Sequence, residues 1–124
     1  MLQLRNIFLG LLCSAILISH MSCTTYSTES YTKVCDSWKG SDINKLLMNW
    51  GIPSDEYTMP NGDKMYTWLW IGGSVITAGY SDWLNMAYAN KVTYWCKTTF
   101  TVNQAGIIYF WKWEGNNCVA KDED

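Results

Sequence analysis

The chain has almost none of the side chains on which enzymes and phosphate-binding proteins commonly depend. Its only histidine is His20 and its only arginine is Arg5, so both lie in the first 22 residues. If that segment is removed, no imidazole remains to act as a base or to bind zinc. No guanidinium remains to hold a phosphate or a guanine with two hydrogen bonds. We therefore expect no enzymatic activity, no cofactor and no metal site.

The charged residues also disfavour catalysis and nucleic-acid binding. Without Arg5, the nine Lys and Arg residues become eight, against eleven Asp and Glu residues, so the net charge is −3. That sign is wrong for a surface that binds nucleic acid. Asp55-Glu56 is the only adjacent acidic pair in the body of the chain, and it follows Pro53 in an expected loop. We interpret this pair as solvated surface.

The first 22 residues have the layout of a secretory signal peptide. Arg5 precedes an apolar run over 7–18, and short polar residues follow it. A helix of about 12 residues covers only ~18 Å, whereas a bilayer core is ~30 Å thick. The sequence therefore predicts a leader over 1–22 that is cleaved on export.

Cys23 follows this leader and is the candidate for a lipid anchor. Ser22-Cys23 resembles the cleavage site of bacterial lipoproteins, in which a lipidated cysteine becomes the new N-terminus; His20 stands where that family prefers Leu. The resemblance implies a palmitate-carrying protein of the bacterial cell envelope, on the periplasmic side of the outer membrane, with a membrane and an envelope protein as partners. The alternative is ordinary secretion, with Cys23 trimmed off or paired.

Three more cysteines lie beyond Cys23. The hairpin described below turns the chain so that Cys118 can reach Cys96, and an exported protein meets an oxidising compartment. We expect this disulfide, which would stabilise the fold by about 3 kcal/mol. Cys35 would then be a buried, inert thiol. A metal site of three cysteines is the rival interpretation, and an unlipidated Cys23 would allow two bridges.

The remaining chain predicts one α+β domain. Residues 23–34 are expected to comprise the lipidated Cys23, which the resemblance implies, and a flexible tether, which the polar and aperiodic composition indicates. The domain is expected over 35–120, with an acidic tail at 121–124. We expect one or two short N-terminal helices packed on an antiparallel sheet of three or four strands.

The helical part is best marked around residues 41–51. Ser41 is the expected N-cap, and Gly51 is expected to end the helix in a left-handed conformation. Cys35 and Trp38 are expected in a turn or short helix before it. A single apolar stripe follows the helical spacing: Ile43, Leu46, Leu47 and Trp50.

The strands are marked by aromatic and β-branched residues. One strand is expected over 64–71, after a loop that ends in the turn Asn61-Gly62-Asp63. A hairpin is expected from 91–102 and 107–115, with Gly106 at its turn and Val102 opposite Ile107. The face expected against the helix carries Val92, Tyr94, Cys96, Phe100, Val102, Ile107, Tyr109, Trp111 and Trp113. The face expected to be partly wet carries Thr93, Trp95, Lys97, Thr99, Thr101, Ile108, Phe110 and Lys112.

Residues 72–90 are the least defined segment. They are apolar and broken by glycines, and they are longer than a usual loop. Residues 74–78 could extend a strand, and Ser81 could cap a short helical turn. Two interpretations stay open: the segment closes the core, or it forms a contact surface for a partner.

Two resemblances follow from these motifs. Gly40, Asp42, Leu46 and the run Trp50-Gly51-Ile52-Pro53, followed by a strand, resemble the opening of SmpA/OmlA-type outer-membrane lipoproteins, which implies helices followed by three strands. The second pattern is similar to that of a family of small uncharacterised bacterial lipoproteins, and it implies an envelope location without catalytic residues. Its motifs are Cys96-x-Thr98-x-Phe100, Gly106-Ile107 and Gly115-Asn116-x-Cys118.

The aromatic content suggests what such a protein does. The chain has eight Trp residues, more than a core of this size needs, and Trp and Tyr are enriched at interface hot spots. We expect a protein-binding or scaffold module; the alternatives are a glycan- or peptidoglycan-binding module that stacks sugars on exposed Trp, and an inhibitor of a secreted enzyme. The expected interaction surface consists of Trp68, Trp70, Trp83, Trp95 and Phe110.

Overall fold

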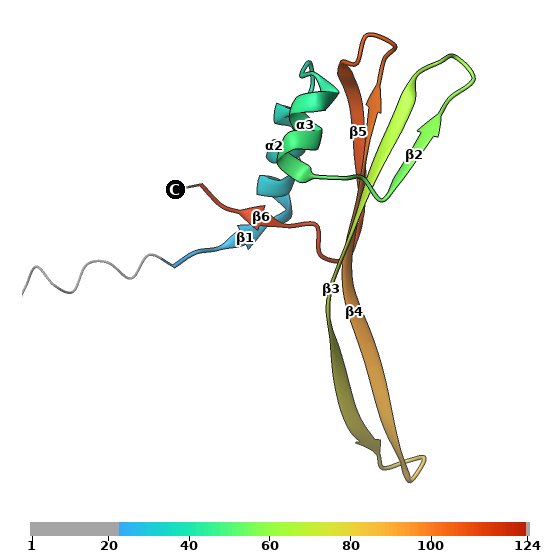
Figure 1. Cartoon of the computed structure of the whole chain (residues 1–124). Helices are drawn as coiled ribbons and strands as arrows, with labels where there is room; N and C mark the ends of the chain where they lie inside the picture. Colours follow the sequence, from blue (N-terminus) through green and yellow to red (C-terminus); the bar gives the residue numbers. More distant parts are fainter. Residues whose placement is uncertain (1–22, 124) are drawn as a thin grey trace, which may run out of the picture.

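The computed structural model describes residues 23–123, which form two helices, a four-stranded sheet and a separate two-stranded sheet (Figure 1). The predicted α+β class is confirmed, with more strands than expected. The signal peptide predicted over 1–22 lies outside the described residues. No helix among residues 23–123 is long and apolar enough to cross a membrane.

Helix α2 (Thr28–Ser37) occupies most of the segment predicted as a flexible tether. Ser27 caps this helix, because its hydroxyl accepts a hydrogen bond from the backbone N–H of Ser30 at 3.1 Å. Glu29 adds a negative charge to the first turn, where the helix dipole favours it. The hydroxyl-rich composition therefore supplies a helix cap rather than a solvated linker.

The two ends of the described chain pair with each other. Strand β1 (Tyr26–Ser27) is antiparallel to β6 (Ala120–Lys121). The carboxylate of Asp122 accepts hydrogen bonds from the hydroxyls of Ser27 and Ser30. The predicted tether over 23–34 is therefore wrong from Tyr26 onward, and the predicted tail at 121–124 is ordered at least through Asp122.

Helix α3 (Ile43–Trp50) lies where a helix was predicted, but Asp42 caps it instead of Ser41. The Asp42 carboxylate accepts from the backbone N–H of Asn44 at 2.7 Å. The Ser41 carbonyl instead accepts from the N–H of Ile108 at 3.0 Å, which ties this turn to the sheet. Gly51 ends the helix with a φ of 79°, as predicted.

The larger sheet is an antiparallel meander in the order β2-β3-β4-β5. Its strands are β2 (Asp55–Thr58), β3 (Lys64–Ser81), β4 (Met86–Val102) and β5 (Ile108–Gly115). The prediction missed β2, which pairs with the first four residues of β3. It placed a strand over 64–71, with a possible extension over 74–78, whereas β3 continues to Ser81.

The predicted hairpin of β4 and β5 is present, with a different register. Val102 pairs with Ile108, and a bulge follows, so that Phe100 pairs with Trp111. The shift beyond the bulge is two residues, which leaves each side chain on its predicted face. Near the turn the prediction is wrong, because the bulge buries Ile108 and exposes Tyr109.

Both helices cover one face of the sheet, called the helix-side face below (Figure 1). Trp50 of α3 lies edge-to-face against Phe100, with ring centroids 5.3 Å apart, and against Trp68 at 5.7 Å. Half-buried aromatic residues surround this contact. The buried core consists of Cys35, Ile43, Leu46, Phe100, Val102 and Ile108.

A disulfide joins Cys96 to Cys118, as predicted, with Cα atoms 4.9 Å apart. The chain can turn back to it because residue 115 is a glycine: a Cβ there would lie 2.3 Å from the carbonyl oxygen of Trp95. The bridge uses two of the three thiols that the rival metal site would need. Cys35 is fully buried, and burial raises the pKa of its thiol to about 12, so it is protonated and inert at neutral pH.

Candidate functional site

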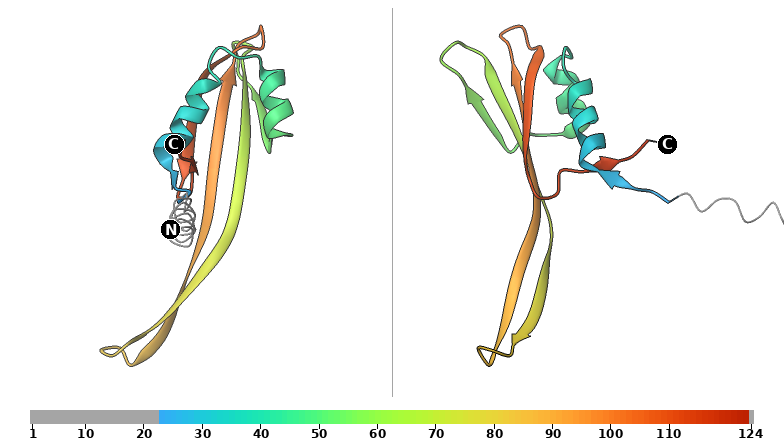
Figure 2. Two further views of the ribbon diagram at one scale, coloured as in Figure 1. Left: turned by 90° about the vertical axis from the view of Figure 1, so that its left-hand side faces the viewer. Right: turned by 180° about the vertical axis from the view of Figure 1, so that it is seen from behind.

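The hairpin of β3 and β4 extends far beyond the rest of the sheet. Strand β2 covers β3 only as far as Thr67, and β5 covers β4 only back to Cys96. Residues 70–95 therefore form a two-stranded projection, called the arm below, with its tip at residues 82–85 (Figures 1 and 2). In both views of Figure 2 the arm is a long twisted ribbon, and neither α2 nor α3 extends along it.

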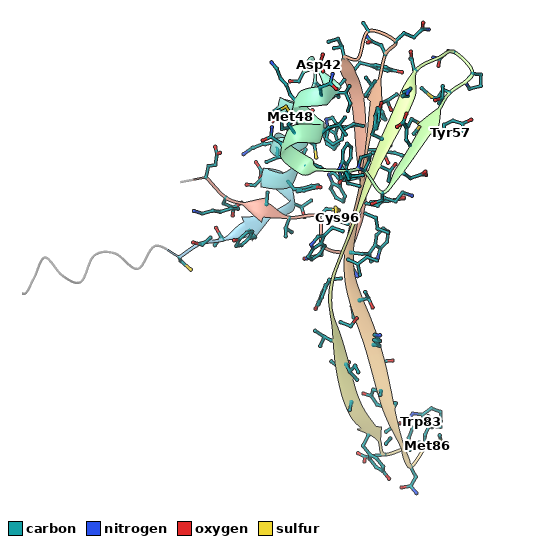
Figure 3. All side chains as sticks on the ribbon, viewed as in Figure 1. Asp42, Met48, Tyr57, Trp83, Met86 and Cys96 are labelled. Carbon is teal, nitrogen blue, oxygen red and sulfur yellow. A yellow bond between two sulfur atoms is a disulfide. The ribbon has the colours of Figure 1, made fainter. Side chains whose placement is uncertain are left out.

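The arm exposes large apolar side chains along its whole length. Trp83 at the tip is 86 % exposed, and Figure 3 shows it at the end of the arm with Met86. The only charged residues of the arm are Asp82 and Lys91. At least a third of the surface is exposed in each of Trp70, Ile71, Val75, Ile76, Tyr80, Trp83, Leu84, Met86, Tyr88, Val92 and Tyr94.

This arrangement decides between the two interpretations of residues 72–90. The segment does not close the core, because β3 and β4 continue to pair beyond the rest of the sheet and lead away from both helices (Figure 1). The helical turn expected at Ser81 is absent as well, since this residue ends β3 and pairs with Met86. Extension of the strand over 74–78 is confirmed. The contact-surface interpretation stays a prediction.

The two faces of the arm differ in character. A bulge between Ile71 and Ser74 shifts the register, and beyond it Val75 pairs with Val92. Paired residues share a face, so the continuation of the helix-side face can be followed along β4. On this face the large apolar side chains are Trp70, Val75, Met86, Tyr88, Val92 and Tyr94. The opposite face carries Ile71, Ile76, Tyr80, Lys91 and the half-buried Trp95 among small residues.

Two aromatic rings of the helix-side face lie directly over glycines. A Cβ at Gly79 would be 2.5 Å from the ring of Tyr88, which pairs with it across the strands. A Cβ at Gly72 would be 2.3 Å from the ring of Trp70. An aromatic ring placed over a glycine protects backbone that would otherwise be open to water. These glycines therefore set the position of the rings on this face.

An open groove of about 700 Å³ lies where the arm joins the domain. Its polar groups are largely occupied: the Tyr31 hydroxyl and Thr98 Oγ1 are 2.6 Å apart, and Trp68 Nε1 donates to the Gly51 carbonyl at 3.2 Å. Burial raises the pKa of Tyr31 above its usual value. Asn49 and Asn117 add amide groups. The apolar lining includes Tyr26, Tyr31, Trp50, Trp68, Trp70 and Val119.

The structure does not bring the five predicted interface residues together. Trp68 is half-buried against Phe100, with ring centroids 6.0 Å apart. Trp70 lines the groove and Trp83 lies at the tip. Trp95 and Phe110 are on the face opposite the helices.

The predicted interaction surface did not include Tyr88 and Met86. Their alternation with Asn90, Val92 and Tyr94 is the period-2 signal of a strand, and it could have shown that these side chains share one face.

Comparisons with models of protein families, with curated proteins and with solved structures found no match to this chain. The resemblance to bacterial lipoproteins therefore stays a prediction.

Proposed function

We propose that this chain is a non-catalytic protein of the bacterial cell envelope, anchored by lipid on Cys23, that binds another protein through the arm. The observation that carries the proposal is a two-stranded projection with exposed large apolar side chains along its length. An isolated two-stranded hairpin is at best marginally stable in water. A partner that covers the arm would remove this apolar surface from water, which is the main driving force of association.

The chemistry of the arm favours a protein as its partner. Tyr, Trp and Met are enriched in protein interfaces, whereas charged side chains are depleted at their centres. The arm follows that composition, with charges only at Asp82 in the tip and at Lys91. Native edge strands are often protected by several charges or by proline, and the β3 side of the arm has neither.

Photo-crosslinking in living cells tests this proposal. A photoreactive residue at Tyr88 should form covalent adducts with a protein. The same residue at Tyr57, an exposed tyrosine of β2, is the matched control and should form none. Absence of a protein adduct at Tyr88, or equal adducts at both positions, would contradict a role for the arm.

The lipid anchor is tested separately. Cys23 is exposed and lies three residues before β1, where a lipid would not disturb the fold. We expect the intact mass of membrane-extracted protein to include acyl chains on a chain that begins at Cys23. A Cys23→Ser variant that is still retained by membranes would contradict the anchor.

A glycan-binding module is the second candidate. It is supported by Trp70, which is 51 % exposed, together with the amides of Asn49 and Asn117 in the same groove. Trp50 and Trp68 do not extend a flat platform there, because their planes meet at 78°. Titration with peptidoglycan fragments tests this candidate. Trp70→Ala should abolish binding and Trp95→Ala should leave it unchanged; no binding by the unaltered chain would contradict it.

A further inference from the structure

The arm has a projecting residue at its tip and a hollow at its base. Trp83 projects from the tip of the arm and is the most exposed tryptophan among those noted above. The groove of about 700 Å³ lies at the base and is lined on the same face by Trp68 and Trp70. About 11 residues of strand separate the two ends, so Trp83 is roughly 35 Å from the groove of its own chain. Trp83 can therefore reach such a groove only in another molecule.

We propose that two copies of this chain pack their arms against each other in antiparallel directions, through the helix-side faces. In this arrangement Trp83 of each copy enters the groove of the other copy, beside Trp50 and Trp70. One two-fold axis generates both contacts, as in most homodimers, in which the same patch is used on both subunits. This inference rests on the proposed function, in that it takes the arm to be the binding surface and names the partner.

The apolar area is of the size that a stable dimer needs. The exposed parts of the apolar side chains on this face, together with Trp83 and Leu84 at the tip, amount to on the order of 900 Å², since a large aromatic residue can bury about 150–250 Å². A stable interface typically buries about 800 Å² on each partner. A second arm, with equal length and equal apolar surface, matches this area.

The charge distribution also fits a second copy. Asp82 and Lys91 give the arm no net charge, whereas the eleven acidic and eight lysine side chains after residue 22 leave the chain at −3. Lys91 lies on the opposite face, where it pairs with Ile76, and Asp82 lies in the tip. The paired strands of two such faces can meet without burying an unpaired charge, which would oppose association. Asp82 adjoins Trp83 at the tip and is, of these two charges, the one near the proposed contact.

Cysteine crosslinking in the full-length chain tests the antiparallel arrangement. Asn49→Cys places a thiol in the groove, and Trp83→Cys places one at the tip. We expect the double variant to form a covalent dimer on mild oxidation, with peptide mapping showing a 49–83 linkage. Asn44→Cys with Trp83→Cys is the matched control, because Asn44 is exposed on the same helix but does not line the groove. Linkages between two copies of residue 83, or equal dimer in the control, would overturn the arrangement.

The solution mass of the full-length chain provides the second readout. We expect a dimer, and we expect Trp83→Ala to raise its dissociation constant at least tenfold. Ile76→Ala, on the opposite face and 67 % exposed, should change it less than threefold. A monomer at all concentrations, with the arm bound to phospholipid vesicles or to a different protein, would overturn the inference. A different protein on the arm would still support the proposed function, whereas no protein adduct at Tyr88 would contradict both.

Discussion

The same two strands, β3 and β4, pass through two environments. In the domain, their helix-side face packs under α2 and α3, and Phe100 is fully buried. In the arm, the same face of β4 continues through Tyr94, Val92 and Tyr88, which remain exposed. The residue composition of this face barely changes along the strand, whereas the helices cover it only in the domain. A hydrophobic strand face therefore predicts that another surface packs on it, but not whether that surface belongs to the same chain.

The largest expected effect compares two aromatic residues on the same face of β4. Phe100→Ala should lower the free energy of unfolding by about 3–5 kcal/mol, since it empties the centre of the core. Tyr88→Ala should change it by less than about 0.5 kcal/mol, as for surface positions. Denaturant titration at a protein concentration far below the dissociation constant of the proposed dimer measures both. Similar losses would show that the arm folds as part of the core.

The disulfide is expected to have the next largest effect. It closes the loop that contains β5 and lies where the arm meets the domain (Figure 3). Cys118→Ser should reduce the stability of the domain by about 3 kcal/mol through loop entropy. The test is denaturant titration of the variant beside the oxidised and reduced wild type. Reduced wild type should behave as Cys118→Ser does, and no change on reduction would contradict a structural role for the bridge.

Much of the domain could be predicted because its signals are local. The stripe from Ile43 to Trp50 and the left-handed Gly51 define α3 within a few residues. The turn near Gly106 locates the hairpin. The alternation of side chains along a strand predicted the correct face for Trp111, although the register of the pairing differs from the predicted one. The disulfide followed from that hairpin.

The features that escaped prediction depend on distant partners. Helix α2 is anchored by Asp122, a residue 92 positions from Ser30. The cap of α3 moved to Asp42 because the Ser41 carbonyl bonds to β5. The full length of the arm was not predicted, and core closure and a contact surface both stayed open for residues 72–90, because nothing local distinguishes a core from an interface. The groove joins residues from β1, both helices, the sheet and the chain end, so no motif could mark it.

The glycines of the arm allow a finer comparison within the exposed region. Gly79→Ala forces the Tyr88 ring to move, because the new methyl would lie 2.5 Å from it, whereas Gly73→Ala meets nothing within 4 Å. We expect Tyr88 ring resonances to shift only in the first variant. The global stability of both should change by less than about 0.5 kcal/mol, since neither site belongs to the core. Unshifted resonances in Gly79→Ala would contradict this position of the ring.

The smallest expected effect concerns charged contacts, because the four ion pairs found among residues 23–123 all lie in the domain and none in the arm. Trp111 Nε1 donates to the Asp36 carboxylate at 2.9 Å, and the Lys39 ammonium is 3.3 Å away. The hydrogen bond from Trp111, helped by Lys39, holds the pKa of Asp36 below its usual value. A lowered pKa in the folded state stabilises the protein above the unfolded-state pKa of about 3.9, and this contribution is lost as the pH falls through the folded-state pKa.

Comparison of Asp36→Asn with the unaltered chain isolates this contact. The stability difference between them should be greatest near neutral pH and should shrink as the pH falls from about 5 to about 2, because the carboxylate becomes protonated. Denaturant titration at each pH measures the difference, with Asp82→Asn at the tip of the arm as the control. A difference that stays constant with pH would mean that the charge of Asp36 does not stabilise the fold. The same slope for Asp82→Asn would mean that a carboxylate of the arm contributes to stability as Asp36 does, which would break the contrast between the arm and the domain.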